Sequence, residues 1–177
     1  MRRAELIDQI PGLRRYARAL TGDPWAADDL VQDTLERACA RWRLWTVGTD
    51  LRAWLFTLMH NLHVSDLRRA QRREGSGLPV DPDDVAAELV APDAAQDLAM
   101  DLQRCLLRLP EEQRVVLLLV SLEDMSYEQV ARITGSPIGT VMSRLSRART
   151  RLQALMNAAA QSAPPDAYAP PHLRRLK

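Results

Sequence analysis

Residues 126–155 read SYEQVARITGSPIGTVMSRLSRARTRLQAL, and this stretch decides the fold expected for the chain. Ser126, with a glutamine three residues later, forms a capping-box pattern that starts a helix. Gly135 stands where a left-handed residue ends that helix. Ser136 and Pro137 supply an N-cap and a first-turn proline for a second helix. So short a turn sets the second helix across the first, and this predicts the helix-turn-helix geometry that enters the DNA major groove.

The second of these helices has two chemically different faces. Its apolar residues recur at steps of three and four, which predicts a buried stripe of Ile138, Val141, Leu145, Ala148, Leu152 and Leu155. The opposite face carries hydroxyls and arginines and no acid from Thr140 to Arg151. Small hydroxyls allow close approach to base edges, and arginine donates to guanine and to phosphates. A plain solvated face is the alternative, but such a face normally mixes charges of both signs. The pattern therefore favours contact with DNA.

Charge and composition divide the chain into pieces. The formal net charge of the 177 residues is only +1, yet residues 76–103 contain acids and no lysine or arginine. No alternation typical of β-strands occurs, so the expected fold is all-α, with two small helical domains joined by a flexible acidic linker. The expected pieces are a helical domain at 4–73, a linker at 74–95, a second helical domain at 96–157 and a disordered Ala/Pro-rich tail at 158–177.

Several classes of function find no support in the sequence. Cys39 and Cys105 are too few for a metal cluster or a disulfide framework, and their apolar helical positions predict two buried thiols. His60 and His63 have a spacing that suits a metal, but no third ligand accompanies them. No phosphate-binding glycine loop or nucleophile–base pair is present. No apolar run follows the basic start of the chain or reaches membrane length. We therefore expect a cytoplasmic protein without membrane insertion, catalytic activity, metal or cofactor.

Residues 28–42, DDLVQDTLERACARW, predict an amphipathic helix. Its apolar side consists of Leu30, Val31, Thr34, Leu35 and Ala38. Another face repeats polar residues at steps of three and four, namely Asp29, Gln32, Asp33 and Glu36. The residues alone leave two interpretations open, a solvated face or a docking face for a basic partner.

Residues 50–73, DLRAWLFTLMHNLHVSDLRRAQRR, predict a helix that Asp50 caps. Aromatic side chains occupy its first turns and arginines its end. Such a combination suits unstacked DNA, because bases stack on rings while arginines hold the backbone. The alternative is that Trp54 and Phe56 belong to the core, and we expect this of at least one of them.

Three segments together resemble one protein family. DDLVQDTLERA, RAWLFTLMHNLHVSDLRR and LPEEQRVVLLLVSLEDMSYEQVARITGSPIGTVMSRLSRARTRL resemble, in this order, the extracytoplasmic-function sigma factors of bacterial RNA polymerase. The resemblance covers about residues 8–157. It implies that the first domain is sigma region 2 and that the second is sigma region 4.

The resemblance also implies roles for particular residues. Core polymerase, through its β′ clamp helices and β flap, is the implied partner, and the clamp helices would bind Asp29, Gln32, Asp33 and Glu36. The minus-ten element would be recognised and melted by Thr46, Asp50, Trp54, Asn61, Arg68 and Arg69. The minus-thirty-five element would be read by Ser136, Thr140, Ser143, Arg144, Arg147 and Arg149. Met142 departs from the Lys or Arg of many relatives, which removes one contact. An anti-sigma protein is a further implied partner.

Two other functions remain as alternatives. A helix-turn-helix regulator that acts without core polymerase would not need Asp29, Asp33 or the region of Trp54. A sigma mimic that only titrates an anti-sigma protein would not need an outward Arg147 beside Ser143.

Overall fold

The computed structural model describes residues 3–42, 50–74 and 94–162. Within these ranges the fold is all-α, as predicted, and no strand occurs. The helices are α1 (Arg3–Ile7), α2 (Ile10–Thr21), α3 (Pro24–Ala40), α4 (Leu51–Glu74), α5 (Ala94–Leu107), α6 (Glu111–Ser121), α7 (Tyr127–Thr134) and α8 (Ile138–Ser162). We refer to α1–α4 as the N-terminal unit and to α5–α8 as the C-terminal unit. The expected linker falls almost wholly outside the described residues, and so does most of the expected tail.

The N-terminal unit is built on α2, α3 and α4, which pack side by side. Tyr16 of α2 and Phe56 of α4 are almost fully buried, and their rings meet edge to face with centroids 5.2 Å apart. Asp23 caps α3 by accepting a hydrogen bond from the Trp25 amide at 2.8 Å. This cap and Pro24 start α3 four residues before the segment 28–42 that the sequence pattern marked as helical.

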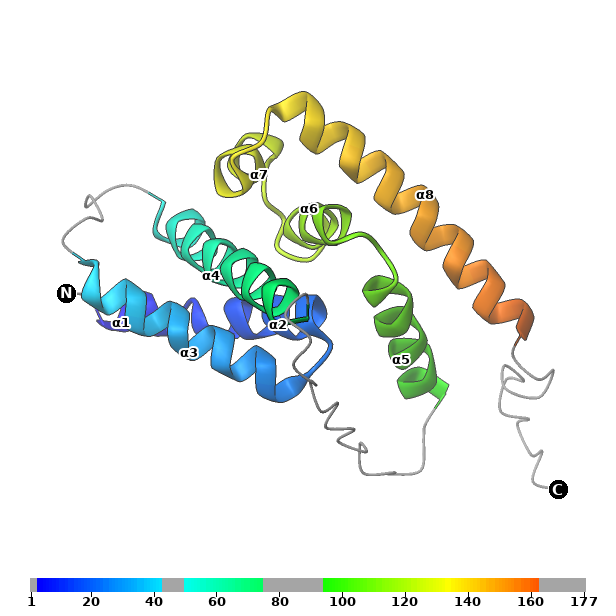
Figure 1. Ribbon diagram of the computed structural model, residues 1–177, viewed down its shortest axis with the longest axis horizontal. Helices are drawn as coiled ribbons and strands as arrows, with labels where there is room; N and C mark the ends of the chain where they lie inside the picture. Colours follow the sequence, from blue (N-terminus) through cyan, green and yellow to red (C-terminus); the bar gives the residue numbers. More distant parts are fainter. Residues whose placement is uncertain (1–2, 43–49, 75–93, 163–177) are drawn as a thin grey trace, which may run out of the picture.

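The C-terminal unit places α8 across α6 and α7 (Figure 1). Its core contains Val116 and Leu119 of α6, together with Val141, Leu145 and Ala148 of α8. These three α8 residues belong to the predicted stripe and are buried, as expected. Ile138 was predicted to share that burial, but 41% of its surface is exposed. It stands in the first turn of α8, where the neighbouring helices do not cover it.

Three further expectations need correction. Cys105 is buried, but Cys39 is exposed, because it lies one position beyond the buried Ala38 on α3. Helix α5 begins at Ala94, before the expected start of the second helical domain. Helix α8 continues to Ser162 and so includes the first residues of the expected tail. Residues 158–160 are all alanines, which have the highest intrinsic helix propensity, and they extend a helix already formed.

The two units contact each other directly. Helix α2 packs against α5 and α6, and α4 packs against α7. In Figure 1, α8 runs along one margin of the molecule and α3 along the opposite margin, so that α4, α6 and α7 lie between them.

Candidate nucleic-acid and polymerase interfaces

The helix-turn-helix has the local geometry that its sequence predicts. The Ser126 hydroxyl accepts a hydrogen bond from the Gln129 amide, and the Gln129 side chain accepts one from the Ser126 amide at 2.9 Å. Gly135 is left-handed, with φ of 62°, and ends α7. The prediction that Ser136 is the N-cap of the second helix is wrong. Helix α8 begins at Ile138, and it is the Pro137 carbonyl that accepts the first helical hydrogen bonds.

The face of α8 that points away from the core is rich in arginine. Arg147 and Arg149 are exposed, while Ser143 and Thr140 are half-buried. Arg144 is held in place on one side of this face. It donates to the Ser136 hydroxyl at 2.9 Å and to the Glu112 carboxylate of α6 at 2.5 Å. The six residues predicted to contact duplex DNA therefore lie along the first half of α8 and in the preceding turn. Of their three arginines, Arg144 forms an ion pair with Glu112, whereas Arg147 and Arg149 are exposed.

The polar row on α3 is a continuous exposed face. Asp29, Gln32, Asp33 and Glu36 are all exposed, and the Gln32 amide donates to Glu36 at 3.0 Å. Thr34, on the buried side, satisfies its hydroxyl by donating to the Leu30 carbonyl at 2.7 Å. Three carboxylates thus face solvent on one helix, at a spacing that a partner with basic side chains can match.

This polar row borders a groove between the two units. The groove has a volume of about 430 Å³. Its charged lining residues include Asp29 and Asp33 of α3, Asp66 of α4 and Arg114 of α6. Its apolar lining residues include Leu20, Leu30 and Leu67.

The residues predicted to bind the minus-ten element share one stripe of α4. Asp50 caps the helix by accepting from the Ala53 amide at 3.0 Å. Trp54, Asn61 and Arg68 follow at steps of four and seven, which places them on one side of the helix. Asn61 and Arg68 are exposed. Thr46, predicted to belong to this set, lies outside the described residues.

The two aromatic side chains of this region have different surroundings. Phe56 belongs to the core, whereas Trp54 is half-buried. The Trp54 ring lies edge to face with the Trp42 ring, and their centroids are 6.2 Å apart. The expectation that at least one of Trp54 and Phe56 is core is confirmed by Phe56. Arg69, next to Arg68, is exposed and paired with Asp66 at 3.0 Å.

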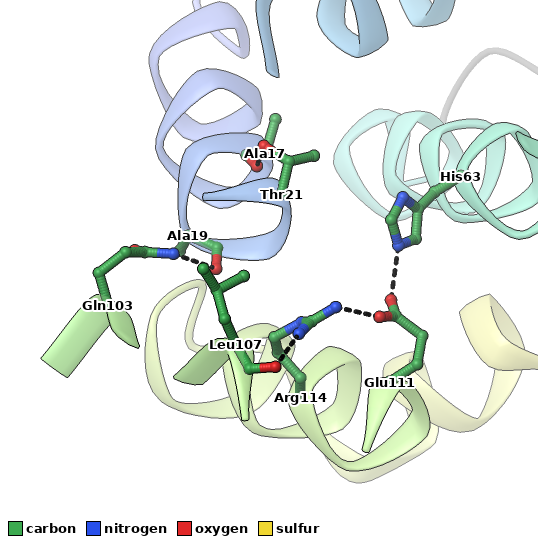
Figure 2. Close-up of polar contacts among 8 residues, drawn as sticks. All are labelled: Ala17, Ala19, Thr21, His63, Gln103, Leu107, Glu111 and Arg114. Atoms are coloured by element: carbon green, nitrogen blue, oxygen red, sulfur yellow. Dashed lines mark hydrogen bonds and ion pairs between the residues drawn. The ribbon is translucent and has the colours of Figure 1, made fainter. Parts of the chain in front are cut away.

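His63 of α4 takes part in the contact between the two units. His63 shares a hydrogen bond of 2.5 Å with Glu111, which also pairs with Arg114 (Figure 2). Burial raises the pKa of the Glu111 carboxyl, but His63 and Arg114 together lower it more, so the pKa lies below its usual value. No group of three or more potential metal ligands occurs in the part of the chain that the structure describes.

Sequence reasoning missed the residues that join the two units. Glu123, in the turn between α6 and α7, is fully buried and bonded to Arg15 of α2 and Arg52 of α4. Gln129 of α7 donates to Asp50 at 2.6 Å, and Gln103 of α5 donates to the Ala19 carbonyl at 3.2 Å. These partners are far apart in the sequence, and no periodic pattern marks them. The feature that could have indicated this contact is Glu123 itself, an acidic residue that directly follows the apolar sequence of α6.

Comparison with known proteins agrees with this architecture. Residues 6–60 match the model of the Sigma2 domain of PhyR, and residues 99–152 match the model of Sigma-70, region 4. ECF RNA polymerase sigma factor EcfG of Rhodopseudomonas palustris is 39% identical over 157 residues, a span that covers 87% of this chain and 84% of that protein. No helix in the described residues has the length and apolar character needed to cross a membrane.

Two solved structures share the arrangement of helices. The sigma factor RpoE of Bartonella quintana, crystallised with the anti-sigma factor NepR, is 35% identical and superposes with a TM-score of 0.73 over 88% of this chain and 96% of that chain. The anti-anti-sigma factor PhyR of the same organism, also crystallised with NepR, is 17% identical, with a TM-score of 0.59 over 87% of this chain and 50% of that chain, and shows the fold alone. The two matched regions, their order and the identity to EcfG establish that the chain belongs to the ECF RNA polymerase sigma factors.

Proposed function

We propose that the chain binds core RNA polymerase, brings it to promoters and opens the promoter DNA, without a catalytic step or a cofactor of its own. One observation carries the proposal. Two exposed surfaces of opposite charge lie on separate units, the carboxylates of Asp29, Asp33 and Glu36 on α3 and the arginines Arg147 and Arg149 on α8. One chain therefore offers an acidic surface for a basic protein and a basic surface for DNA.

The acidic surface is the proposed site for core polymerase. The exposed row on α3 fits the basic clamp helices of the β′ subunit that the family uses. Charge complementarity speeds association and fixes the register of the two surfaces. Region 4 is proposed to contact the β flap, as the family does.

The basic surface is the proposed reader of duplex DNA. Arg147 and Arg149 project from α8 into solvent, and Thr140 and Ser143 are small enough for the helix to approach base edges. Arg144 is oriented by Glu112 and Ser136, so its guanidinium is held before DNA binds. We assign the minus-thirty-five element to this surface.

The stripe on α4 is proposed to capture the melted minus-ten element. A ring that is half-buried, as Trp54 is, can stack on an unpaired base, and the arginines near the end of α4 can hold the backbone. Flipping a base out of the duplex costs a few kcal/mol, which a preformed pocket can offset. Opening would then follow from capture of single-stranded DNA and would need no ATP.

An anti-sigma protein is the proposed regulatory partner. RpoE, which resembles both units of this chain, was crystallised with an anti-sigma factor. We infer that a protein of this class covers the surfaces named above and keeps the chain from polymerase in the cytoplasm.

Transcription in vitro with sigma-free core polymerase tests the proposal. Addition of the chain should give transcripts from defined start sites. Asp33→Arg should abolish both transcription and co-purification with core, because it reverses a charge in the acidic row. Asp8→Arg, which reverses an exposed acid outside the row, is the matched control and should retain both. Specific duplex binding by the chain alone, without any association with core, would contradict the proposal.

A sigma mimic that sequesters an anti-sigma protein is the second candidate, because residues 6–60 match the Sigma2 domain of PhyR. The same experiment separates the two functions. A mimic would bind an anti-sigma protein but would support no transcription with core.

A further inference from the structure

Glu123 occupies an unusual position for an acidic residue. Its side chain is completely buried, although it lies in the turn between α6 and α7 at the surface of the C-terminal unit. It is the N-terminal unit that buries it. Burial of an unpaired carboxylate is strongly unfavourable, so a site of this kind has to supply positive charge and hydrogen bonds.

Two arginines of the N-terminal unit supply that charge. Arg15 of α2 donates from Nε to one carboxylate oxygen of Glu123 at 3.0 Å, and its Nη2 lies 2.9 Å from the same oxygen. Arg52 of α4 donates to the other oxygen at 2.5 Å. The guanidinium of Arg52 also lies over the Phe56 ring, 5.7 Å from its centroid. Each oxygen of Glu123 therefore has its own arginine, and each arginine comes from a different helix.

The backbone on both sides is shaped to this contact. A Cβ atom at Gly12 of α2 would lie 3.2 Å from Glu123 Oε2, so glycine leaves the space that the carboxylate fills. On the other side, Asp124 has a left-handed backbone with φ of 50°, which turns the chain immediately after Glu123. The fit is therefore built into the main chain of both units as well as into their side chains.

Further polar contacts join the two units at other positions along α4. His63 of α4 meets Glu111 of α6, and Gln129 of α7 donates to Asp50 at the start of α4 (Figure 2 shows the His63 contact). The polar contacts thus hold α7 and the preceding turn against the first residues of α4. Asp50 is among the residues proposed to bind the minus-ten element. Its side chain is exposed, but its two carboxylate oxygens already accept hydrogen bonds, one from the Ala53 amide and one from Gln129. The exposed arginines Arg147 and Arg149 of α8 are left uncovered.

We propose that Glu123, Arg15 and Arg52 form a latch that closes the two units on each other in the free protein and withholds the start of α4 from DNA. RpoE in complex with its anti-sigma factor resembles the chain across both units, so this closed arrangement also occurs in a relative. In this chain, Glu123, Arg15 and Arg52 are the side chains that we propose hold it. The Coulomb attraction of a buried ion pair is largely offset by the cost of desolvating its charges, so the latch opens readily once a partner binds the open form. The masking of DNA contacts rests on the proposed function, whereas the latch itself does not.

Energy transfer between two dyes on the full chain, without polymerase, tests the latch. One dye is placed on Cys39 of α3 and the other on a cysteine introduced by Gln153→Cys on α8, and both positions are exposed. Cys105 is buried and stays unlabelled. The labelled chain with Glu123, Arg15 and Arg52 unchanged should give high energy transfer between the two dyes. Glu123→Gln should raise the fraction of molecules with separated units by about ten-fold or more. The double variant Arg15→Ala, Arg52→Ala should raise this fraction further, because it leaves the buried Glu123 carboxylate without partners.

Matched controls separate the latch from general loss of charge. Glu128→Gln removes an exposed carboxylate of α7, and Arg132→Ala removes an exposed arginine of the same helix. Both should keep the transfer of the unchanged chain. Circular dichroism should show the same helix content for every variant. Low transfer in the unchanged chain, or unchanged transfer in folded latch variants, would overturn the proposal.

A second arm adds core polymerase to the labelled chain. Loss of transfer on binding, at a lower polymerase concentration for Glu123→Gln than for the unchanged chain, supports the opening step. If core does not bind at all, the proposed function fails, while the first arm still decides whether the latch exists.

Discussion

The helix-turn-helix and the contact between the two units both hold polar side chains in defined places, but they depend on the sequence in different ways. In the helix-turn-helix, the partners of Ser126 and Gly135 lie within a few residues along the chain. At the contact between the units, Glu123 meets Arg15 across more than a hundred residues. Local contacts form when their own helix forms, whereas the long-range contacts form only when both units are folded and closed. A surface of the first kind persists in any arrangement of the units, and one of the second kind can be switched.

The largest expected effect concerns the core beneath the helix-turn-helix. Leu145→Ala removes a fully packed side chain of α8, and we expect the free energy of unfolding to fall by about 2–5 kcal/mol. Urea denaturation followed by circular dichroism measures it. The control is Leu102→Ala on α5, where 39% of the side chain is exposed and the loss should be much smaller. Equal losses in the two variants would show that the stripe of α8 is not the core that we describe.

The next effect concerns DNA. Arg147→Ala should weaken the affinity of the chain, bound to core polymerase, for its promoter by about 1–3 kcal/mol if the guanidinium contacts a base. Arg132→Ala on α7 serves as control, because that arginine bonds to the Glu128 carbonyl of its own helix. An unchanged affinity in a promoter titration would remove Arg147 from the DNA-reading surface.

Substitution of Gly22 tests the contact between the two units. It is left-handed, with φ of 75°, and a Cβ atom there would lie 2.5 Å from a methyl carbon of Leu107 in the other unit. Gly22→Ala should cost about 1–2 kcal/mol of stability from backbone strain, and it should also loosen the contact between the units. Gly139→Ala, where a Cβ atom meets nothing within 4 Å, should cost nothing or stabilise α8 slightly.

The two causes at Gly22 can be separated. Leu107→Ala removes the steric overlap and leaves the backbone strain. If Gly22→Ala lowers dye transfer equally with leucine and with alanine at position 107, the overlap with Leu107 has no part in its effect on closure.

The smallest effect is a pH dependence of stability. Burial lowers the pKa of His60 below its ordinary value of 6.5, the charge of His63 lowers it further, and Glu111 opposes this in part. The unfolded chain therefore binds more protons than the folded chain as the pH falls through 6.5, and the folded state is destabilised there. His60→Gln should flatten the change in unfolding free energy between about pH 7.5 and about pH 5.5. A slope as steep as that of the unchanged chain would assign the dependence to other groups.

The same comparison explains what could be predicted from the sequence. The caps of α4 and α7, the buried stripe of α8 and the exposed row on α3 follow from spacing, because each depends on one helix and its neighbours along the chain. The predicted burial of Ile138 and Cys39 was wrong, because burial at the edge of an apolar stripe depends on where the neighbouring helix ends. Glu123 was missed for a different reason. Its partners Arg15 and Arg52 are ordinary surface arginines until the two units meet.

The length of α8 has a practical consequence. With 25 residues, it extends for about 37 Å. Its first half carries the side chains that we propose contact DNA, so Ser162 lies several helical turns from them. A fluorescent protein or affinity handle fused behind that residue would therefore lie far from the DNA, and we expect it to leave promoter recognition intact.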